Sequence, residues 1–321
     1  MAKWGGYKST HIMKIKIKIL IVPKFEIGTM DDGVIGEAEL YWQEYMKNSR
    51  QVILPGGKIL YVSGEIALVV TGEGKVNAAI TLTQVLSHPD FDFSECYIIG
   101  TGCAGGIAGN CIMGDVVLVT SVADFDLGHR VDLSEISDKN HGGWFRDSTF
   151  DDYAFKRLNT ALIDRIYNGV KDIRLGTTPK TENAMKSNFS SMYPKLRNPK
   201  VIKGSGVTGD NYWKGEIGHE IALKIAESYG CEDPLAVTEM EDVAIASVAE
   251  KFGLLDRLII IRDCVNMDLF MNGATPESTW LDGKEFSEMV QSEKGEAVDI
   301  FETSRYNNFR VGKAIIELLA E

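Results

Sequence analysis

The chemistry of this chain is concentrated in short glycine-rich or polar segments that follow apolar ones. The clearest is G-T-G-C-A-G-G at residues 100–106, directly after an apolar stretch at residues 96–99. The apolar stretch predicts a buried strand, and glycines beyond a strand let backbone N–H groups approach a ligand closely. We therefore expect a small polar or anionic ligand at the end of a sheet, beside Thr101, Gly102 and Cys103.

Two carboxylates lie where a short apolar segment at residues 235–237 meets an expected helix, in the sequence Thr238-Glu239-Met240-Glu241. Thr238 and Glu241 have the spacing of a capping box, which satisfies two backbone N–H groups of a helix. The alternative is a carboxylate that faces a cleft and accepts hydrogen bonds from the vicinal hydroxyls of a sugar. Met240 would then pack against the apolar side of the sugar ring.

A second polar group follows an apolar strand candidate at residues 257–261 and includes Asn266 and Asp268. In open α/β sheets, ligands gather at the carboxyl ends of the strands. The amide of Asn266 both donates and accepts hydrogen bonds, which suits a purine edge. Asp268 would serve as a general acid if its pKa were raised. A solvated loop after the strand fits the same residues, so both interpretations stay open.

Two further groups lie in polar loops. Tyr212 and Trp213 are adjacent aromatic residues and suggest a surface on which a base stacks, although anchoring of the loop to the core fits equally well. His129 lies near Asp126 and Asp132 in a long polar stretch, a length that is typical of functional loops. An ordinary surface position without a functional role is the simpler interpretation of His129.

Several other kinds of site are disfavoured. The five histidines and five cysteines show no metal-ligand spacing and no C-x-x-C, so we expect neither a metal nor a disulfide framework. The G-x-S-x-G of a serine hydrolase does not occur. Residues 100–105 fit G-x-G-x-x-G, but further glycines interrupt the segment where a dinucleotide site needs its helix. We therefore expect no cofactor, and NAD titration would test the dinucleotide alternative.

The composition narrows the partners. The 34 basic and 46 acidic residues give a net charge of −12, which disfavours nucleic acid or an anionic membrane surface. No run approaches the roughly 20 apolar residues that span a bilayer. Residues 1–12 lack the hydrophobic core of a signal peptide and are interpreted as a disordered extension. A cytoplasmic protein is expected.

The elements that must position these groups alternate between strands and helices, without a break or repeat. This pattern predicts one α/β domain over residues 13–321. The expected strands lie at residues 14–22, 51–54, 58–62, 66–71, 96–99, 116–119, 201–203, 235–237 and 257–261. The expected helices lie at residues 37–47, 76–86, 155–170, 217–228, 240–252 and 312–319, with a surface excursion at residues 172–200.

The order of the motifs resembles the nucleoside phosphorylase superfamily and, within it, the purine nucleoside permease family. The resemblance covers roughly residues 14–275. The segments that carry it, in chain order, are Phe25-Glu26, Glu37-Ala38-Glu39, T-G-E-G-K-V-N-A-A at residues 71–79, G-C-A-G-G at residues 102–106, Asp210-Asn211-Tyr212-Trp213, Glu239-Met240-Glu241 and the strand that ends at Asn266.

The resemblance implies a three-layer αβα sandwich around a mixed sheet and cleavage of the N-glycosidic bond of a purine nucleoside. It implies that Glu241 binds the ribose hydroxyls, with Met240 beside the sugar. Tyr212 and Trp213 match the aromatic pair that lies against the base. Asn266 matches the position that contacts the N7 side of the purine, where many members have Asp. Hydrogen bonding there stabilises the leaving base as the sugar becomes oxocarbenium-like.

The chain departs from the phosphate-using members of the superfamily in the glycine run. Those members often have an Arg and a Ser or Thr there, whereas this chain has Gly100 and Cys103. A phosphate would then need backbone amides, Thr101 and a cation from elsewhere, such as Lys24 or Arg130. Phosphate as a co-substrate therefore stays open.

The hydrolytic members instead use an N-terminal Glu that holds the attacking water, and Glu37 is the best match to it. The amide of Asn266 cannot donate a proton outright. It would favour 6-oxopurines by hydrogen bonding, unless Asp268 serves as the acid.

Two functions follow from these observations. The first is a purine nucleoside phosphorylase or nucleosidase. The second is a nucleoside-binding protein without turnover that serves nucleoside uptake, as the family name implies. Superfamily members commonly assemble, so a homo-oligomer is also expected.

Overall fold

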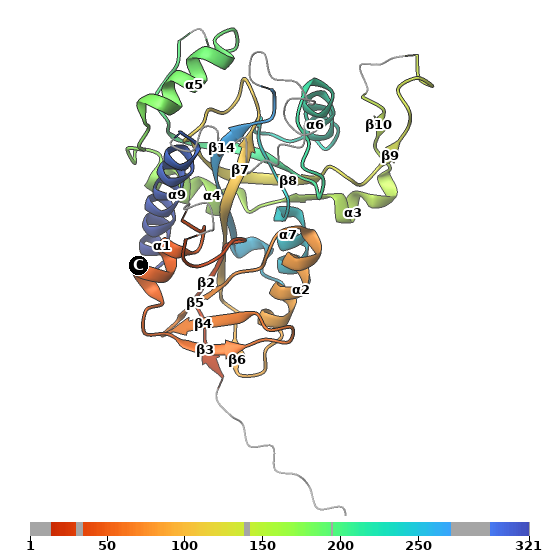
Figure 1. Cartoon of the computed structure of the whole chain (residues 1–321). Coiled ribbons are helices and arrows are strands. Elements are labelled where there is room, and N and C mark those ends of the chain that lie inside the picture. Colours follow the sequence, from red (N-terminus) through yellow and green to blue (C-terminus); the bar gives the residue numbers. More distant parts are fainter. Residues whose placement is uncertain (1–13, 30–34, 138–141, 194, 271–295, 321) are drawn as a thin grey trace, which may run out of the picture.

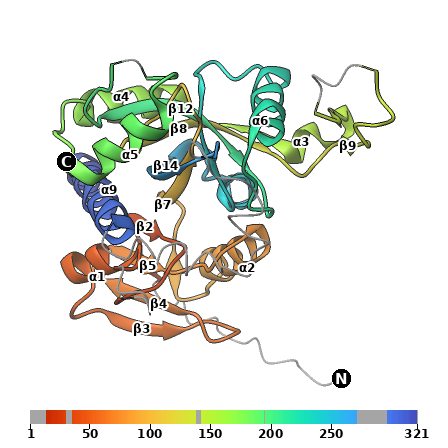
Figure 2. The same cartoon turned by 45° about the horizontal axis from the view of Figure 1, so that its top comes forward.

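A large mixed sheet with helices on both faces forms the centre of the molecule. The computed structural model in Figure 1 describes residues 14–29, 35–137, 142–193, 195–270 and 296–320. Helices α1 (Glu39–Tyr45) and α9 (Glu296–Ala320) lie on one side of the sheet, and α2 (Lys75–Leu86) and α7 (Asp242–Lys251) lie on the other (Figures 1 and 2). The α/β class and the layered sandwich around a mixed sheet are confirmed.

The central sheet has ten strands in the order β11-β8-β12-β13-β7-β2-β5-β4-β3, and β14 pairs with both β7 and β8. Their bounds are β2 Ile19–Val22, β3 Arg50–Ile53, β4 Ile59–Ser63, β5 Ile66–Val69, β7 Tyr97–Gly106, β8 Val116–Asp124, β11 Phe155–Arg157, β12 Val201–Thr208, β13 Leu235–Glu239 and β14 Leu258–Met267. Two short pairs stand apart from it, β1 (Ile15–Lys16) with β6 (Phe91–Asp92) and β9 (His129–Arg130) with β10 (Trp144–Phe145).

Five strands of this sheet close on themselves. Strand β8 pairs with β12, β12 with β13, β13 with β7, β7 with β14, and β14 again with β8. The closure brings the polar ends of β13 and β14 beside β7. Because helices cover both faces, the strands are apolar on both faces, as in the fully buried Leu20, Ile99, Val117 and Ile260.

The glycine-rich run lies inside a strand and not after one, contrary to the sequence-based expectation. Strand β7 continues through Gly106 and pairs with β14 in parallel along its length. A Cβ atom at Gly102 would lie only 2.7 Å from a carboxylate oxygen of Glu37, so the glycine is what lets that carboxylate approach the strand. Residues 107–115 hold no helix before β8, so the segment lacks the helix that a dinucleotide site requires.

The helices differ from the expected ones mainly at their N-termini. The helix expected from residue 155 starts as strand β11, and α4 (Thr160–Val170) begins after Asn159, whose side chain accepts from the Leu162 N–H at 3.1 Å. The expected surface excursion contains α5 (Pro179–Phe189), which Thr178 caps and Pro179 opens. Capping residues without an apolar stripe were the only signal for this helix.

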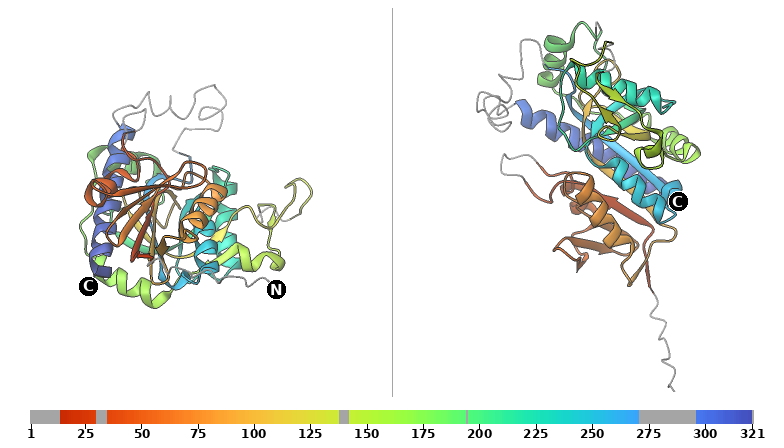
Figure 3. Two further views of the ribbon diagram at one scale, coloured as in Figure 1. Left: turned by 90° about the horizontal axis from the view of Figure 1, so that it is seen from below. Right: turned by 90° about the vertical axis from the view of Figure 1, so that its right-hand side faces the viewer.

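Two segments extend the fold beyond the expected elements. Helix α9 is far longer than the expected helix at residues 312–319 and runs along one side of the sheet (Figure 3). The hairpin β9–β10 and α3 (Asp151–Ala154) reach out from the body, near α6 (Glu216–Ser228) (Figures 1 and 2). The extension predicted for residues 1–12 lies outside the described residues, and the single domain over residues 13–321 stays a prediction.

Candidate active site

A cavity of about 670 Å³ lies where β7, β13 and β14 meet. Its walls come from these strands, from the chain after β2, from the loop after β12 and from α9. The cavity brings together most of the residues that the sequence singled out: Glu37, Cys103, Tyr212, Trp213, Met240, Glu241, Asn266 and Asp268.

Glu37 lies at one end of this cavity with its side chain only 2% exposed. Its Oε1 accepts from the Cys103 N–H at 2.8 Å, and its Oε2 accepts from the N–H groups of Lys24 at 3.0 Å and Phe25 at 3.3 Å. Burial by itself raises the pKa of Glu37, but Arg305 and the other positive and amide neighbours outweigh it, so the pKa lies below its ordinary value. Glu37 is therefore an ionised carboxylate held by backbone amides.

Arg262 is the centre of a buried ion-pair network beside Glu37, with its side chain 1% exposed. The guanidinium donates to Asp242 at 2.6 and 2.9 Å, to Glu239 at 2.9 Å and to Glu241 at 3.0 Å. Burial and the nearby Asp242 raise the pKa of Glu239 to about 8. The crowding of three carboxyl groups around one guanidinium therefore disfavours ionisation of Glu239.

Glu241 faces the cavity between this arginine and the start of α2. Its Oε1 accepts from the Gly74 N–H at 2.9 Å, and its Oε2 accepts from Arg262. Gly74 has a φ of +82°, a conformation that side chains disfavour, and its N–H points at the carboxylate for that reason. Met240 lines the same wall. A buried carboxylate beside an apolar thioether suits a sugar, whose ring has hydroxyls on its edge and an apolar face.

The capping box suggested by Thr238 and Glu241 does not form. Thr238 lies inside β13, and Glu241 precedes α7 without a side-chain cap. Instead, Glu239 Oε2 accepts from the N–H groups of Glu241 at 2.6 Å and Asp242 at 2.7 Å. Because Glu239 satisfies the start of the helix, the carboxylate of Glu241 is left to face the cavity.

The opposite end of the cavity is aromatic. The Trp213 ring stacks on Phe125, with the ring centroids 5.0 Å apart and the ring planes at 9° to each other. This contact anchors the loop that carries Tyr212 and Trp213, and both of these residues also line the cavity. The amide of Asn266 donates to the Tyr212 hydroxyl. A Cβ atom at Gly105 would lie 3.0 Å from Asn266 Oδ1, so this glycine leaves room for the amide over β7.

Charged groups fasten the loop that carries these aromatic residues. Lys75 Nζ, at the start of α2, lies 3.0 Å from Asp124 and 2.9 Å from Asp126. Asp126 accepts from the Asp210 N–H at 2.7 Å, and Asp210 accepts from the Lys75 N–H at 2.9 Å. The aromatic loop is thus tied both to β8 and to α2.

Asp268 lies at the cavity wall, two residues beyond Asn266. Its Oδ1 accepts from the Ala108 N–H at 2.8 Å, and its Oδ2 lies 2.6 Å from His219 Nδ1. The sequence singled out Asp268 but gave no sign of this histidine, which comes from α6.

Three other residues predicted near the glycine run take different positions. Thr101 is buried and donates from its hydroxyl to Asn308 at 2.6 Å, toward α9 and away from the lining. Gly102 has no side chain that could reach the cavity, and this lack of a side chain lets the Glu37 carboxylate approach β7. Lys24 lines the cavity, but its ammonium group donates to the carbonyl groups of Val22 at 2.8 Å and Thr101 at 3.1 Å.

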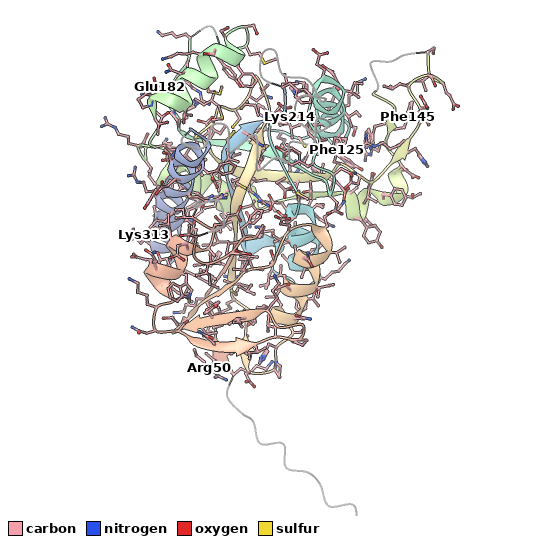
Figure 4. The ribbon with its side chains drawn as sticks, viewed as in Figure 1. Arg50, Phe125, Phe145, Glu182, Lys214 and Lys313 are labelled. Atoms are coloured by element: carbon pink, nitrogen blue, oxygen red, sulfur yellow. The ribbon has the colours of Figure 1, made fainter. Side chains whose placement is uncertain are left out.

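The histidine and arginine of the long polar stretch lie elsewhere too. His129 belongs to the protruding hairpin and pairs with Asp147 at 2.9 Å, apart from Asp126. Figure 4 shows Phe145 on the same hairpin, well away from Phe125. Arg130 lies 4.5 Å from the centroid of the Phe125 ring and lines a neighbouring open cavity of about 730 Å³.

Comparison with known proteins decides the family. The family model for the purine nucleoside permeases matches residues 16–321. The chain belongs to the purine nucleoside permease family. A protein of Schizosaccharomyces pombe named as a probable purine nucleoside permease is 26% identical over 291 residues, which cover 79% of this chain and 78% of that one.

Nucleosidases are also among the proteins that are similar to this chain. The 5′-methylthioadenosine/S-adenosylhomocysteine nucleosidase of Bacillus pumilus is 33% identical over 224 residues, 69% of this chain and 78% of the relative. Two solved structures share the fold. The corresponding Neisseria meningitidis nucleosidase, in complex with methylthio-immucillin-A, has a TM-score of 0.55 at 20% identity, covering 94% of this chain and all of that chain (100%). The futalosine hydrolase of Helicobacter pylori has a TM-score of 0.56 at 16% identity, covering 94% and 98%.

The word permease in the family name raises the question of whether the chain has a helix that could cross a membrane. In the part of the chain that the structure describes, no helix has the length and apolar character to cross a bilayer. Over the same residues, no cluster of three or more histidines, cysteines and carboxylates is arranged to hold a metal ion.

Three residues at the site were missed by the sequence reasoning: Arg262, Arg305 and His219. Arg262 ends an apolar run, and its position there was the one available signal, because a charge inside a buried strand needs a partner. Arg305 and His219 lie on helices whose contacts with the site depend on tertiary packing. No local pattern could have assigned them.

Proposed function

We propose that this chain binds purine nucleosides in the cavity and cleaves their N-glycosidic bond with water as the acceptor. Glu241, with Met240 beside it, receives the ribose, and Tyr212 and Trp213 receive the base. The arrangement of these groups around one cavity of about 670 Å³ supports the proposal, because a nucleoside needs a polar wall for its sugar and an aromatic wall for its base. The nucleosidase names of the family's relatives support it as well.

The position of Glu37 carries the choice of water over phosphate. Three backbone N–H groups that would suit an anion, those of Lys24, Phe25 and Cys103, already donate to its carboxylate. A phosphate dianion there would lie against the negative charges of Glu37 and Glu241, in surroundings that screen charge poorly. A neutral water molecule avoids this repulsion and finds a base in the Glu37 carboxylate.

The reaction then runs between the two ends of the cavity. The bond from C1′ of the ribose to N9 of the purine breaks, and its electron pair leaves with the base. Positive charge develops on the sugar between Glu37 and Glu241, where fixed carboxylates stabilise it. Water adds to C1′ and passes its proton to Glu37, and the departing base takes up a proton from solvent, which gives free ribose and a free base.

Asn266 favours 6-oxopurines in this scheme. Its amide nitrogen has two N–H bonds, and one of them donates to Tyr212. The second can donate to O6 of a 6-oxopurine such as hypoxanthine, whereas adenine has at that position an amino group that donates and does not accept. We therefore expect inosine and guanosine to be better substrates than adenosine.

Chromatography of the free base after incubation with inosine, guanosine, adenosine or uridine, each with and without phosphate, tests the proposal. We expect equal release of hypoxanthine and guanine with and without phosphate, and little release of uracil. The Glu241→Ala variant serves as the inactive control. Release that depends on phosphate would overturn the choice of water. Full activity in the Glu241→Ala variant would overturn the assignment of the cavity.

The permease names of several relatives favour a second candidate, a nucleoside-binding protein that serves uptake and does not turn its ligand over. Calorimetric titration with inosine distinguishes the two. Tight binding with no free base after prolonged incubation would support the binding protein, whereas turnover above background excludes it as the sole function. A cytoplasmic location and assembly into an oligomer stay predictions.

A further inference from the structure

We infer that Glu73 makes the cavity selective for nucleosides with a free 5′-hydroxyl group, and that its carboxylate rejects nucleoside 5′-phosphates. The inference rests on the proposed function and adds to it a specificity-determining residue at the sugar end. Glu73 belongs to the segment just before α2 and lines the same cavity. The proposed function gives this residue no role.

Glu73 differs from the other acidic residues that line the cavity. Those four residues are buried, and each of their carboxyl groups already has hydrogen-bond partners: Glu37, Glu239, Glu241 and Asp268. Glu73 is exposed, and no residue in the described part of the chain donates to its carboxylate. Both of its oxygens are therefore left to accept hydrogen bonds from a ligand.

The backbone on either side of Glu73 is fixed at the sugar end. The residue before it donates its N–H to the Lys24 carbonyl at 3.1 Å, and Lys24 donates its own N–H to Glu37 at 3.0 Å. The residue after it, Gly74, donates its N–H to Glu241 at 2.9 Å. Glu73 therefore lies between the segment that holds Glu37 and the glycine that holds Glu241.

The ribose of a nucleoside has three hydroxyl groups to be recognised. The proposed function gives the two vicinal ones, on C2′ and C3′, to Glu241 and places C1′ beside Glu37. The third, on C5′, lies outside the ring, and Glu73 is the carboxylate at this end that is left to accept from it. An apolar group on C5′ would displace water from the carboxylate without replacing its hydrogen bonds, whereas a hydroxyl replaces them.

The negative charge of Glu73 opposes a phosphate on C5′. The cations that line the cavity, Lys24 and Arg262, are already bound to backbone carbonyls and to buried carboxylates. Lys58 is a cation beside this segment, since a Cβ atom at Gly72 would lie 3.1 Å from its Nζ, but among the described residues it forms no ion pair with Glu73. A 5′-phosphate would therefore meet an unpaired like charge, which disfavours its binding.

Hydrolysis of inosine, inosine 5′-monophosphate and 5′-deoxyinosine tests the inference. We expect the unaltered protein to favour inosine over the monophosphate by about 100-fold in kcat/KM. In Glu73→Gln, kcat/KM on the monophosphate should rise about tenfold, while that on inosine stays within about threefold because the amide oxygen still accepts from the hydroxyl. In Glu73→Ala, kcat/KM should fall about tenfold on inosine, which loses a hydrogen bond to a charged group, and should not change on 5′-deoxyinosine.

Ionic strength separates an effect of charge from an effect of shape. Salt screens the repulsion between an exposed carboxylate and a phosphate. Added salt should therefore raise kcat/KM on the monophosphate in the unaltered protein, and should raise it less in Glu73→Gln. Glu227→Gln removes one exposed carboxylate from α6, outside the cavity, and is the matched control. This control should change neither the preference between substrates nor its dependence on salt.

Two results would overturn the inference while leaving nucleoside hydrolysis intact. One is an unchanged preference for inosine over its monophosphate in Glu73→Gln. The other is an equal loss on inosine and 5′-deoxyinosine in Glu73→Ala, which would mean that Glu73 only supports the segment before α2. An unaltered protein that releases no hypoxanthine from inosine would instead overturn the proposed function, and the role of Glu73 with it.

Discussion

The two ends of the cavity are built in different ways. At the end that we propose for the sugar, the side chains of Glu37, Glu241 and Arg262 are between 1% and 5% exposed and are held by strands, backbone amides and α9. At the end that we propose for the base, Tyr212 is 53% exposed and lies on a loop that Lys75 fastens to the body. Buried charged groups fix the first end, whereas the ion pairs of Lys75 with Asp124, Asp126 and Asp210 hold the loop at the second end.

The difference matches the demands of the proposed reaction. Charge develops on the sugar, so groups fixed in a dry site stabilise it without having to reorganise. The base only has to be held and released, and a loop suffices for that. Changes at the sugar end should therefore act mainly on kcat, and changes at the base end mainly on KM.

The largest effect is expected from Glu37→Gln. The substituted amide cannot accept the proton of water, and its NH2 group would face the backbone N–H donors that now bind the carboxylate. We expect kcat on inosine to fall about 1000-fold, within the range of general base catalysis, with little change in KM. Steady-state kinetics measure this, with the exposed Glu44→Gln as the control. A loss of less than tenfold would mean that another group activates the water.

A smaller loss with a distinct pH signature is expected from Arg305→Gln. Burial raises the pKa of Glu37, and Arg305 is the strongest of the influences that bring it down. The ionised form therefore persists into the acid range, and kcat should fall only when pH drops through that lowered pKa. Without Arg305, the acid limb should move to higher pH and kcat at neutral pH should fall about tenfold. Arg310→Gln, exposed on the same helix, should move neither quantity.

Some features of the fold and the site could be predicted from the sequence because they depend on residues that are close together in the chain. The α/β class followed from the alternation of apolar strands and amphipathic helices. The layered sandwich, and the residues that we propose for the sugar and the base, followed from the order of short motifs and the family that this order resembles. These features are local, or recur as patterns along the chain. The sequence also indicated the loop with Tyr212 and Trp213, because adjacent aromatic residues among polar ones stand out.

What could not be predicted depends on contacts between distant segments. Arg305 reaches Glu37 from the C-terminal helix, and the two residues are 268 positions apart. The glycine run was expected to follow a strand because glycine disfavours strand interiors. Gly102 lies within β7 because the Glu37 carboxylate approaches the backbone there, a reason that is visible only once both segments are placed.

At the base end, the Lys75→Met variant tests the ion pairs that fasten the loop with Tyr212 and Trp213. Removal of the ammonium group leaves Asp124, Asp126 and Asp210 without the cation that they surround, and their repulsion should loosen the loop. We expect KM for inosine to rise about tenfold while kcat stays within threefold. Added salt should recover part of the loss because it screens the carboxylates. Lys75→Arg should behave nearly as the unaltered protein, and Lys47→Met is the exposed control. A fall in kcat with KM unchanged would place Lys75 with the sugar end instead.

The smallest effect is expected from Tyr212→Phe, which keeps the ring and removes the hydroxyl that accepts from Asn266. A hydrogen bond at a half-exposed site contributes about 1 kcal/mol, because water replaces it. KM for inosine should therefore rise about threefold to fivefold, and the preference for inosine over adenosine should narrow, since the Asn266 amide is then free to turn. Kinetics on both nucleosides measure this, with the exposed Tyr153→Phe as the control. If the loss equalled that of Glu37→Gln, the base end would be as rigidly coupled to the chemistry as the sugar end, and the contrast between the two ends would fail.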